Sequence, residues 1–150
     1  MISASKTGAD QASILLVDDN TNGLIARKAL LEELGYTTAT ASNGEEALGL
    51  FAAGSFDLVV TDYKMPRMDG RELIRRIKAQ RPSTLVILLS GYVEPAGLTE
   101  QSTGADVVIS KSAGEVRHLL RSVERVLRPR VARKPPARQS VTRARVKTVS

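Results

Sequence analysis

The sequence predicts an α/β fold in which a doubly wound parallel sheet of five strands is flanked by five helices, and two observations support this. Between residues 13 and 127, short runs rich in Val, Ile and Leu alternate with stretches that have helical patterns or caps. The short runs are apolar along their whole length, as strands buried on both faces of a sheet are. Five strand–helix units in succession favour a parallel sheet with helices on both faces.

Five segments are expected to be strands. Four are apolar runs. The remaining one, at residues 36–41, has fewer large apolar residues and is more polar. In chain order the strands are expected at residues 14–17, 36–41, 58–60, 85–89 and 107–109.

Four of the helices have clear signals. The first is expected at residues 21–34, with Asn20 or Thr21 as its cap and Gly35 just past its end. The others are expected at residues 43–53, 70–80 and 113–127, and in the last one apolar residues recur every three and four positions. The helix between the fourth and fifth strands has little amphipathic character, because Pro95 and Gly97 fall among polar residues. We therefore expect this segment to be the mobile one.

Charge divides the chain unequally. The formal net charge is +6, but residues 128–150 contain eight Lys or Arg and no acidic residue, so the rest of the chain is mildly acidic. The predicted organisation is a flexible extension at residues 1–12, one domain at residues 13–127, and a basic, disordered tail at residues 128–150. The chain has no cysteine, no apolar run long enough to cross a membrane and no signal peptide at its start, which together favour a cytoplasmic location.

Polar side chains stand at the carboxyl ends of four predicted strands. Asp18 and Asp19 follow the first strand, Asp62 the third, Ser90 the fourth and Lys111 the fifth. Parallel strands present these ends at one edge of the sheet, where ligands bind. Three carboxylates gathered there repel one another by several kcal/mol at a protein-like dielectric. A Mg²⁺ ion, which prefers oxygen ligands and keeps some of its waters, would remove that conflict and leave room for a phosphate.

Each of these residues also has a simpler interpretation when taken alone. An Asp pair after an apolar run is typical of a helix N-terminus, where acids interact favourably with the helix dipole. Asp62 alone fits a turn before a proline, Ser90 followed by glycine fits an ordinary turn, and Lys111 fits a solvated lysine near a helix start. The functional interpretation depends on all of them falling at the same edge.

Four motifs resemble the receiver domain of two-component response regulators, in chemotaxis-regulator-like form. They are VDDN, TDYKMPRMDG, LLSG and GADVVISK, they occur in that order, and the resemblance covers about residues 13–127. It implies a flavodoxin-like fold with strand order 2-1-3-4-5, and phosphorelay signalling in which an aspartyl phosphate is made with Mg²⁺. The donor would be a sensor histidine kinase or a histidine phosphotransfer protein.

The resemblance also implies a role for each matching residue. Asp62 would be the phosphoacceptor, Asp19 a direct metal ligand, and Asp18 a ligand directly or through water. The backbone carbonyl of Lys64 would complete the protein's share of the metal shell. Ser90 would hydrogen-bond the attached phosphoryl group, and Lys111 would pair with it. Such a protein is a signalling phosphoprotein that catalyses only its own phosphorylation and dephosphorylation, not an enzyme in the ordinary sense.

Other positions are expected to tune the signal. Lys64 and Tyr92 would border the path of water that hydrolyses the acyl phosphate. The family usually has an aromatic residue three positions before the lysine, and this chain has Val108 there, so Tyr92 is the alternative candidate for a moving aromatic switch. The family also tends to have proline after the lysine, often with a cis peptide bond; Ser112 stands here, and a cis bond before a non-proline residue costs about 3 kcal/mol.

The output is expected to be a contact with another protein. Residues 128–150 are too few to form a DNA-binding domain, so specific DNA binding is not expected, and phosphorylation would change affinity for a downstream protein or for a second receiver in a dimer. The chain would be a free-standing receiver or the receiver segment of a hybrid sensor kinase or phosphorelay. Two alternatives from other classes are a haloacid dehalogenase-type phosphatase, and a protein whose basic tail binds nucleic acid or an anionic surface through charge.

Overall fold

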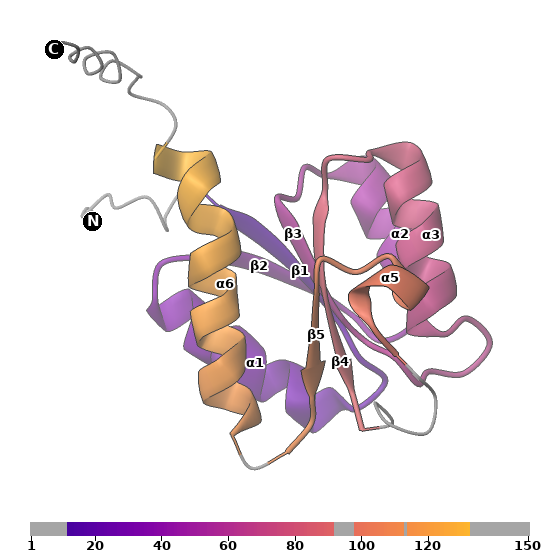
Figure 1. The fold of residues 1–150 in the computed structure, drawn as a ribbon, viewed down its shortest axis with the longest axis horizontal. Coiled ribbons are helices and arrows are strands. Elements are labelled where there is room, and N and C mark those ends of the chain that lie inside the picture. Colours follow the sequence, from indigo (N-terminus) through magenta and orange to yellow (C-terminus); the bar gives the residue numbers. More distant parts are fainter. Residues whose placement is uncertain (1–11, 92–97, 113, 133–150) are drawn as a thin grey trace, which may run out of the picture.

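The computed structural model describes residues 12–91, 98–112 and 114–132, which form a three-layered α/β fold (Figure 1). Five parallel strands make one sheet in the order β2-β1-β3-β4-β5, which confirms the predicted fold and strand order. The strands are β1 (Ser13–Val17), β2 (Thr37–Ala41), β3 (Leu58–Asp62), β4 (Leu85–Ser90) and β5 (Val107–Ser110).

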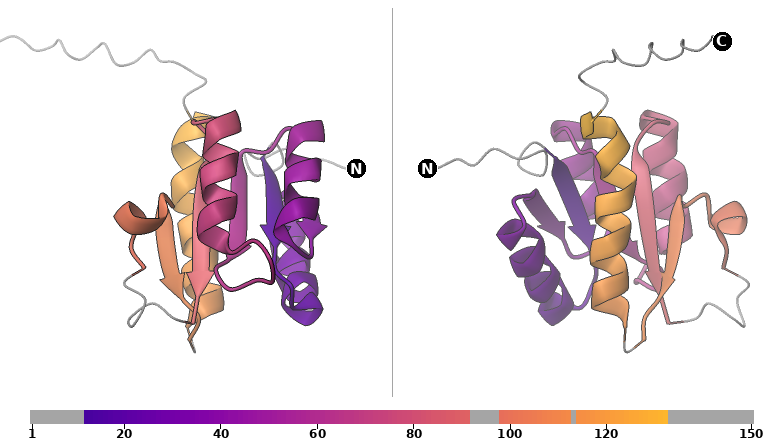
Figure 2. Two further views of the ribbon diagram at one scale, coloured as in Figure 1. Left: turned by 90° about the vertical axis from the view of Figure 1, so that its right-hand side faces the viewer. Right: turned by 60° about the vertical axis from the view of Figure 1, so that its left-hand side comes forward.

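Helices cover both faces of the sheet. On one face lie α2 (Gly44–Ala53) and α3 (Gly70–Gln80), and on the other lie α1 (Thr21–Glu33) and α6 (Glu115–Ala132) (Figure 1). The short helix α5 (Glu100–Thr103) lies beside β5 at the outer edge of the sheet, as the two further views show (Figure 2).

The core divides into two halves because neighbouring residues of a strand point to opposite faces. In β1, Leu15 and Val17 pack toward α2 and α3, whereas Ile14 and Leu16 pack toward α1 and α6. All four are at most 2% exposed. This burial on both faces is what the uninterrupted apolar runs predicted.

Side-chain caps fix where the helices begin. The side-chain oxygen of Asn20 accepts a hydrogen bond from the Gly23 N–H at 3.2 Å, and Asn43 accepts one from Glu46 at 2.8 Å. The first cap agrees with the prediction. In the second helix Asn43 is the cap rather than the first helical residue. Because Asn20 is the cap, α1 begins only two residues after Asp19.

Some element bounds differ from the prediction. β3 and β4 each extend to the polar residue that follows the apolar run, so Asp62 and Ser90 belong to strands. The last helix continues through Ala132, five residues past the predicted end at residue 127, because the apolar pattern that set the predicted end stops before the helix does. The weak fourth helix predicted near Pro95 falls partly outside the described residues, and α5 has only four residues.

The predicted extension at residues 1–12 lies almost wholly outside the described residues, and so does the basic tail from residue 133 onward. Among the helices of the described chain, none is both long and apolar enough to cross a membrane.

Candidate functional site

The carboxyl ends of β1, β3, β4 and β5 bring the predicted site residues to one edge of the sheet. Asp62 and Ser90 are the last residues of β3 and β4, while Asp18 and Lys111 directly follow β1 and β5. Backbone hydrogen bonds continue past the strand ends: the Lys111 N–H donates to the Ser90 carbonyl at 2.9 Å, and the Asp18 N–H donates to the Ala41 carbonyl at 3.1 Å. The sheet itself therefore fixes the positions of these residues.

Three carboxylates meet at this edge. Asp18, Asp19 and Asp62 each offer an oxygen, and these oxygens all lie within 4.8 Å of one another. Asp18 is 1% exposed and Asp62 8% exposed, whereas Asp19 is open to solvent. Oxygen ligands at this spacing, with one open side, suit Mg²⁺, which binds few protein carboxylates and keeps several waters. The residues present thus fit the ion that the sequence predicted.

Lys111 lies between the two buried carboxylates. Its ammonium nitrogen is 3.0 Å from Oδ1 of Asp62 and 3.6 Å from Oδ2 of Asp18. One oxygen of Asp62 also accepts a hydrogen bond from the Tyr63 N–H at 3.0 Å. Asp62 is therefore a buried carboxylate that contacts both a cation and a backbone N–H donor.

Burial raises the pKa of the Asp62 carboxyl, and the nearby charge of Asp18 raises it further. The hydrogen bond from Lys111 opposes this but does not outweigh it. Lys111 favours the ionised form of Asp62, but without a bound cation the desolvation of the carboxyl is the larger effect. A divalent ion at the three carboxylates would lower the pKa of Asp62 again.

The pKa of Asp18 shifts the other way. Burial alone would raise it, but hydrogen bonds from the Asn20 N–H and the Arg27 side chain, together with the charge of Lys111, lower it overall. The Asn20 N–H lies 2.9 Å from Oδ1, and Nη1 of Arg27 lies 2.9 Å from Oδ2. Asp18 is therefore held ionised by the protein's own groups.

Arg27 is a site residue that the sequence analysis missed. It is 9% exposed, and it lies on the buried face of α1 between Leu24 and Leu31. Besides bonding Asp18, it donates from Nε and Nη2 to one carboxylate oxygen of Glu115, at 3.2 and 3.1 Å. An arginine at the three-and-four spacing of buried leucines was the available signal, because such a residue needs a partner.

The loop after β3 carries Lys64, which is exposed. Its far end is fixed by the Gly70 N–H, which donates to the Tyr63 carbonyl at 2.7 Å. Gly70 fits tightly: a Cβ there would lie 2.6 Å from the Asp62 carbonyl oxygen and 2.8 Å from Leu88. Only a residue without a side chain allows the loop to close so near Asp62.

The remaining predicted positions are placed as follows. Ser90 is 1% exposed at the end of β4, and Val108 is half-buried in β5. Tyr92 lies outside the described residues. Within the described chain no peptide bond is cis, so the Lys111–Ser112 bond is trans.

The strands and the site edge described above match a known protein family. The model of the response regulator receiver domain matches residues 14–124, which includes all five strands except Ser13, the first residue of β1, and the whole site edge. The chain belongs to this receiver-domain family. The sequence-based recognition and the assignment to two-component signalling are thereby confirmed, and a phosphatase of the haloacid dehalogenase type is set aside.

Solved receiver structures agree with this fold. The response regulator TrrA from Thermotoga maritima, solved in complex with Mg²⁺ and BeF, is 36% identical, has a TM-score of 0.70, and matches 78% of this chain and 100% of its own. A CheY-like receiver domain from Methanospirillum hungatei is 31% identical with a TM-score of 0.73, and matches 82% of this chain and 98% of its own.

Curated relatives include both regulators and kinases. The probable transcriptional regulator ycf27 of Cyanidium caldarium is 31% identical over 134 residues, which are 88% of this chain and 54% of the relative. The sensor kinase CckA of Brucella abortus is 38% identical over 87 residues, which are 57% of this chain and 9% of the kinase. This receiver domain thus spans about half or less of these relatives.

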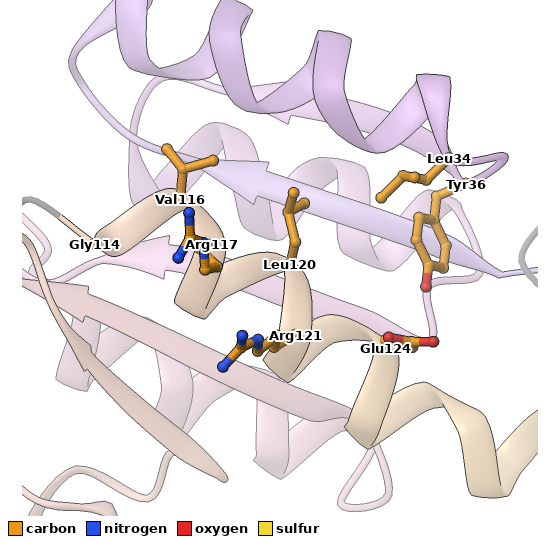
Figure 3. A pocket seen from close by; sticks show the side chains of 8 residues that line it. All are labelled: Leu34, Tyr36, Gly114, Val116, Arg117, Leu120, Arg121 and Glu124. Carbon is orange, nitrogen blue, oxygen red and sulfur yellow. The ribbon is translucent and has the colours of Figure 1, made fainter.

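An open groove of about 870 Å³ lies elsewhere on the receiver domain, along α6 and beside the end of α1 (Figure 3). Its lining includes Leu34, Tyr36, Val116 and Leu120, and none of the three clustered aspartates. The groove is therefore not the place of the carboxylate chemistry.

Proposed function

We propose that Asp62 of this receiver domain accepts a phosphoryl group, with Mg²⁺ held by the three clustered carboxylates. One observation carries the proposal: carboxylate oxygens of Asp18, Asp19 and Asp62 lie within 4.8 Å of one another, and Nζ of Lys111 lies 3.0 Å from Oδ1 of Asp62. Phosphoryl transfer mainly requires alignment and charge neutralisation, which this set of groups supplies.

In the transfer, a carboxylate oxygen of Asp62 attacks the phosphorus of a phosphohistidine, the P–N bond breaks, and an acyl phosphate forms. Bound Mg²⁺ would neutralise charge on the phosphoryl oxygens, and Asp19, Asp62 and the Lys64 carbonyl would hold it, with Asp18 as a direct or water-mediated ligand. Lys111 would release its bond to the Asp62 oxygen and pair with the incoming phosphoryl group. Ser90 would donate a hydrogen bond to that group.

Lys64 and Tyr92 would border the water that hydrolyses the acyl phosphate, so they would set the lifetime of the signal. The same chemistry makes the receiver a catalyst only of its own phosphorylation and dephosphorylation. Because Val108 replaces the usual aromatic residue, Tyr92 would be the moving side chain that reports phosphorylation.

Receiver domains interact with histidine kinases or histidine phosphotransfer proteins, and the phosphodonor here would be one of these. The output would be a changed affinity for a downstream protein or for a second copy of the receiver, which would form a phosphorylation-dependent dimer. The pathway would be cytoplasmic. Similarity to CckA, described as a sensor kinase, supports the alternative of a receiver segment in a hybrid kinase. A second alternative is that the basic tail binds nucleic acid or an anionic surface through its charge, without sequence selectivity.

The test is incubation of the full chain with Mg²⁺ and a small acyl phosphate, followed by intact-mass measurement. We expect a gain of one phosphoryl group that is lost in base. Asp62→Asn should show no gain. Asp57→Asn is the matched control, because Asp57 stands just before β3, at the opposite end of the strand, where it accepts a hydrogen bond from the Ser13 N–H at 2.9 Å. Phosphorylation of Asp62→Asn to the same extent as the control would refute the proposal.

A further inference from the structure

We infer that Arg27 is a built-in counter-cation of the acidic cluster that lowers the affinity of the receiver for Mg²⁺, and that Glu115 limits this effect. The inference rests on the proposed function, because it assumes that Mg²⁺ binds at Asp18, Asp19 and Asp62. It concerns how tightly the ion binds, which the carboxylates alone do not determine.

The geometry places Arg27 in direct competition with a metal ion. Its Nη1 donates to Oδ2 of Asp18 at 2.9 Å, and Lys111 lies 3.6 Å from the same oxygen. The other oxygen of Asp18 accepts the Asn20 N–H at 2.9 Å. Both oxygens of the most buried carboxylate are therefore already engaged by donors of the protein. An arriving cation must share Asp18 with a guanidinium that cannot lose its charge.

Glu115 works on the opposite side of the same guanidinium. Nε and Nη2 of Arg27 both point to Oε2 of Glu115, and the side chains of Arg27 and Glu115 are 10% and 17% exposed. At this low exposure the charges are only partly screened by solvent. Glu115 therefore offsets part of the positive charge that Arg27 presents to Asp18 and holds the guanidinium in place.

The two side chains thus predict opposite changes in metal affinity. Removing the charge of Arg27 leaves the carboxylates with Lys111 as their nearest cation and should tighten Mg²⁺ binding. Removing the charge of Glu115 lets Arg27 act fully on Asp18 and should weaken it. A merely structural role of Arg27 makes the contrary prediction, because a loosened Asp18 would bind the ion less well.

The experiment is a calorimetric titration of the full chain with Mg²⁺, with no phosphodonor present. Arg27→Gln should bind about tenfold more tightly than wild type, the order of effect for a unit charge removed at a partly screened site. Glu115→Gln should bind several-fold more weakly, by the same electrostatic reasoning. Arg27→Lys keeps the charge and should bind within about threefold of wild type.

Lys28→Gln is the matched control. It removes the same charge one residue along α1, from a side chain that is 43% exposed and pairs with Glu32 at 2.7 Å. Its affinity for Mg²⁺ should equal that of wild type. Circular dichroism with Mg²⁺ present shows which variants are folded. If Arg27→Gln is not folded, the inference is tested by Glu115→Gln alone, which should bind Mg²⁺ more weakly than wild type.

Binding by Arg27→Gln that is no tighter than that of Lys28→Gln would overturn the inference, as would binding by Glu115→Gln that is unchanged or tighter. These outcomes leave the proposed function intact as long as wild type binds Mg²⁺ and Asp19→Asn does not. If wild type itself fails to bind Mg²⁺, the metal site in the proposed function is wrong, and the inference about Arg27 falls with it.

Discussion

Substitution of Gly70 by alanine should destabilise the receiver domain and distort the loop next to Asp62. A Cβ at this position would lie 2.6 Å from the Asp62 carbonyl oxygen, 2.8 Å from Leu88 Cδ1 and 2.9 Å from Tyr63 Cα. Two of these three atoms belong to the backbone, so they cannot turn away as the end of a flexible side chain would. Overpacking of this kind costs about 1–3 kcal/mol.

Gly49 provides the matched comparison within the same fold. It lies inside α2, and a Cβ there would meet no atom within 4 Å. Gly49→Ala should therefore stabilise the protein by about 0.5–1 kcal/mol, because alanine restricts the unfolded chain and favours the helix. The two alanine variants should differ in their free energy of unfolding by roughly 1.5–4 kcal/mol.

Urea unfolding followed by far-ultraviolet circular dichroism measures both variants directly. Gly70→Ala should unfold at a lower urea concentration than wild type, and Gly49→Ala at a higher one. Equal stability of the two variants would show that the loop after β3 yields easily, and the argument that Gly70 is required by the closeness of Asp62 would be wrong.

Three further predictions concern charge, core and caps. Burial raises the pKa of Asp62, so the metal-free folded protein binds the carboxyl proton of Asp62 more tightly than the unfolded chain does. Protonation of Asp62 therefore stabilises the fold at low pH, and this stabilisation is lost as pH rises through the folded-state pKa. Thermal unfolding in a chelator should show Asp62→Asn gaining stability relative to wild type as pH rises, and no such trend would contradict the pKa shift. Phe51→Ala should cost about 3–5 kcal/mol in urea unfolding, since Phe51 is fully buried, stacks on Phe56 at 6.4 Å and lies beneath the Arg81 guanidinium. Asn43→Ala should cost about 1 kcal/mol in the same assay by removing the cap of α2, and a loss near zero would mean that water replaces the cap.

The sequence predicted the sheet well because its signals are local. Uninterrupted apolar runs such as residues 85–89 mark strands buried on both faces, and the polar residues that follow each run lie at or next to the strand end. Since parallel strands end at one edge, the sequence alone predicts that Asp18, Asp62 and Lys111 lie together. The structure shows them within ion-pair distance.

The parts that the sequence did not predict depend on contacts between distant segments. Arg27 pairs with Glu115, which lies 88 positions away, and no local pattern joins the two. The pKa of Asp62 likewise depends on how deeply β3 is buried, which competes with the nearby Lys111 charge and outweighs it. The end of α6 was missed for a different reason, because the apolar period stops before the helix does.

The most direct test of the account is a crystal structure of this chain with Mg²⁺ and beryllium fluoride, the pair present in the TrrA complex. The account predicts one Mg²⁺ ion bound by Asp19, Asp62 and the Lys64 carbonyl. The beryllium fluoride group should be bound to Asp62 and in contact with Ser90 and Lys111. An ion bound elsewhere, or a beryllium fluoride group on any carboxylate other than Asp62, would contradict the account.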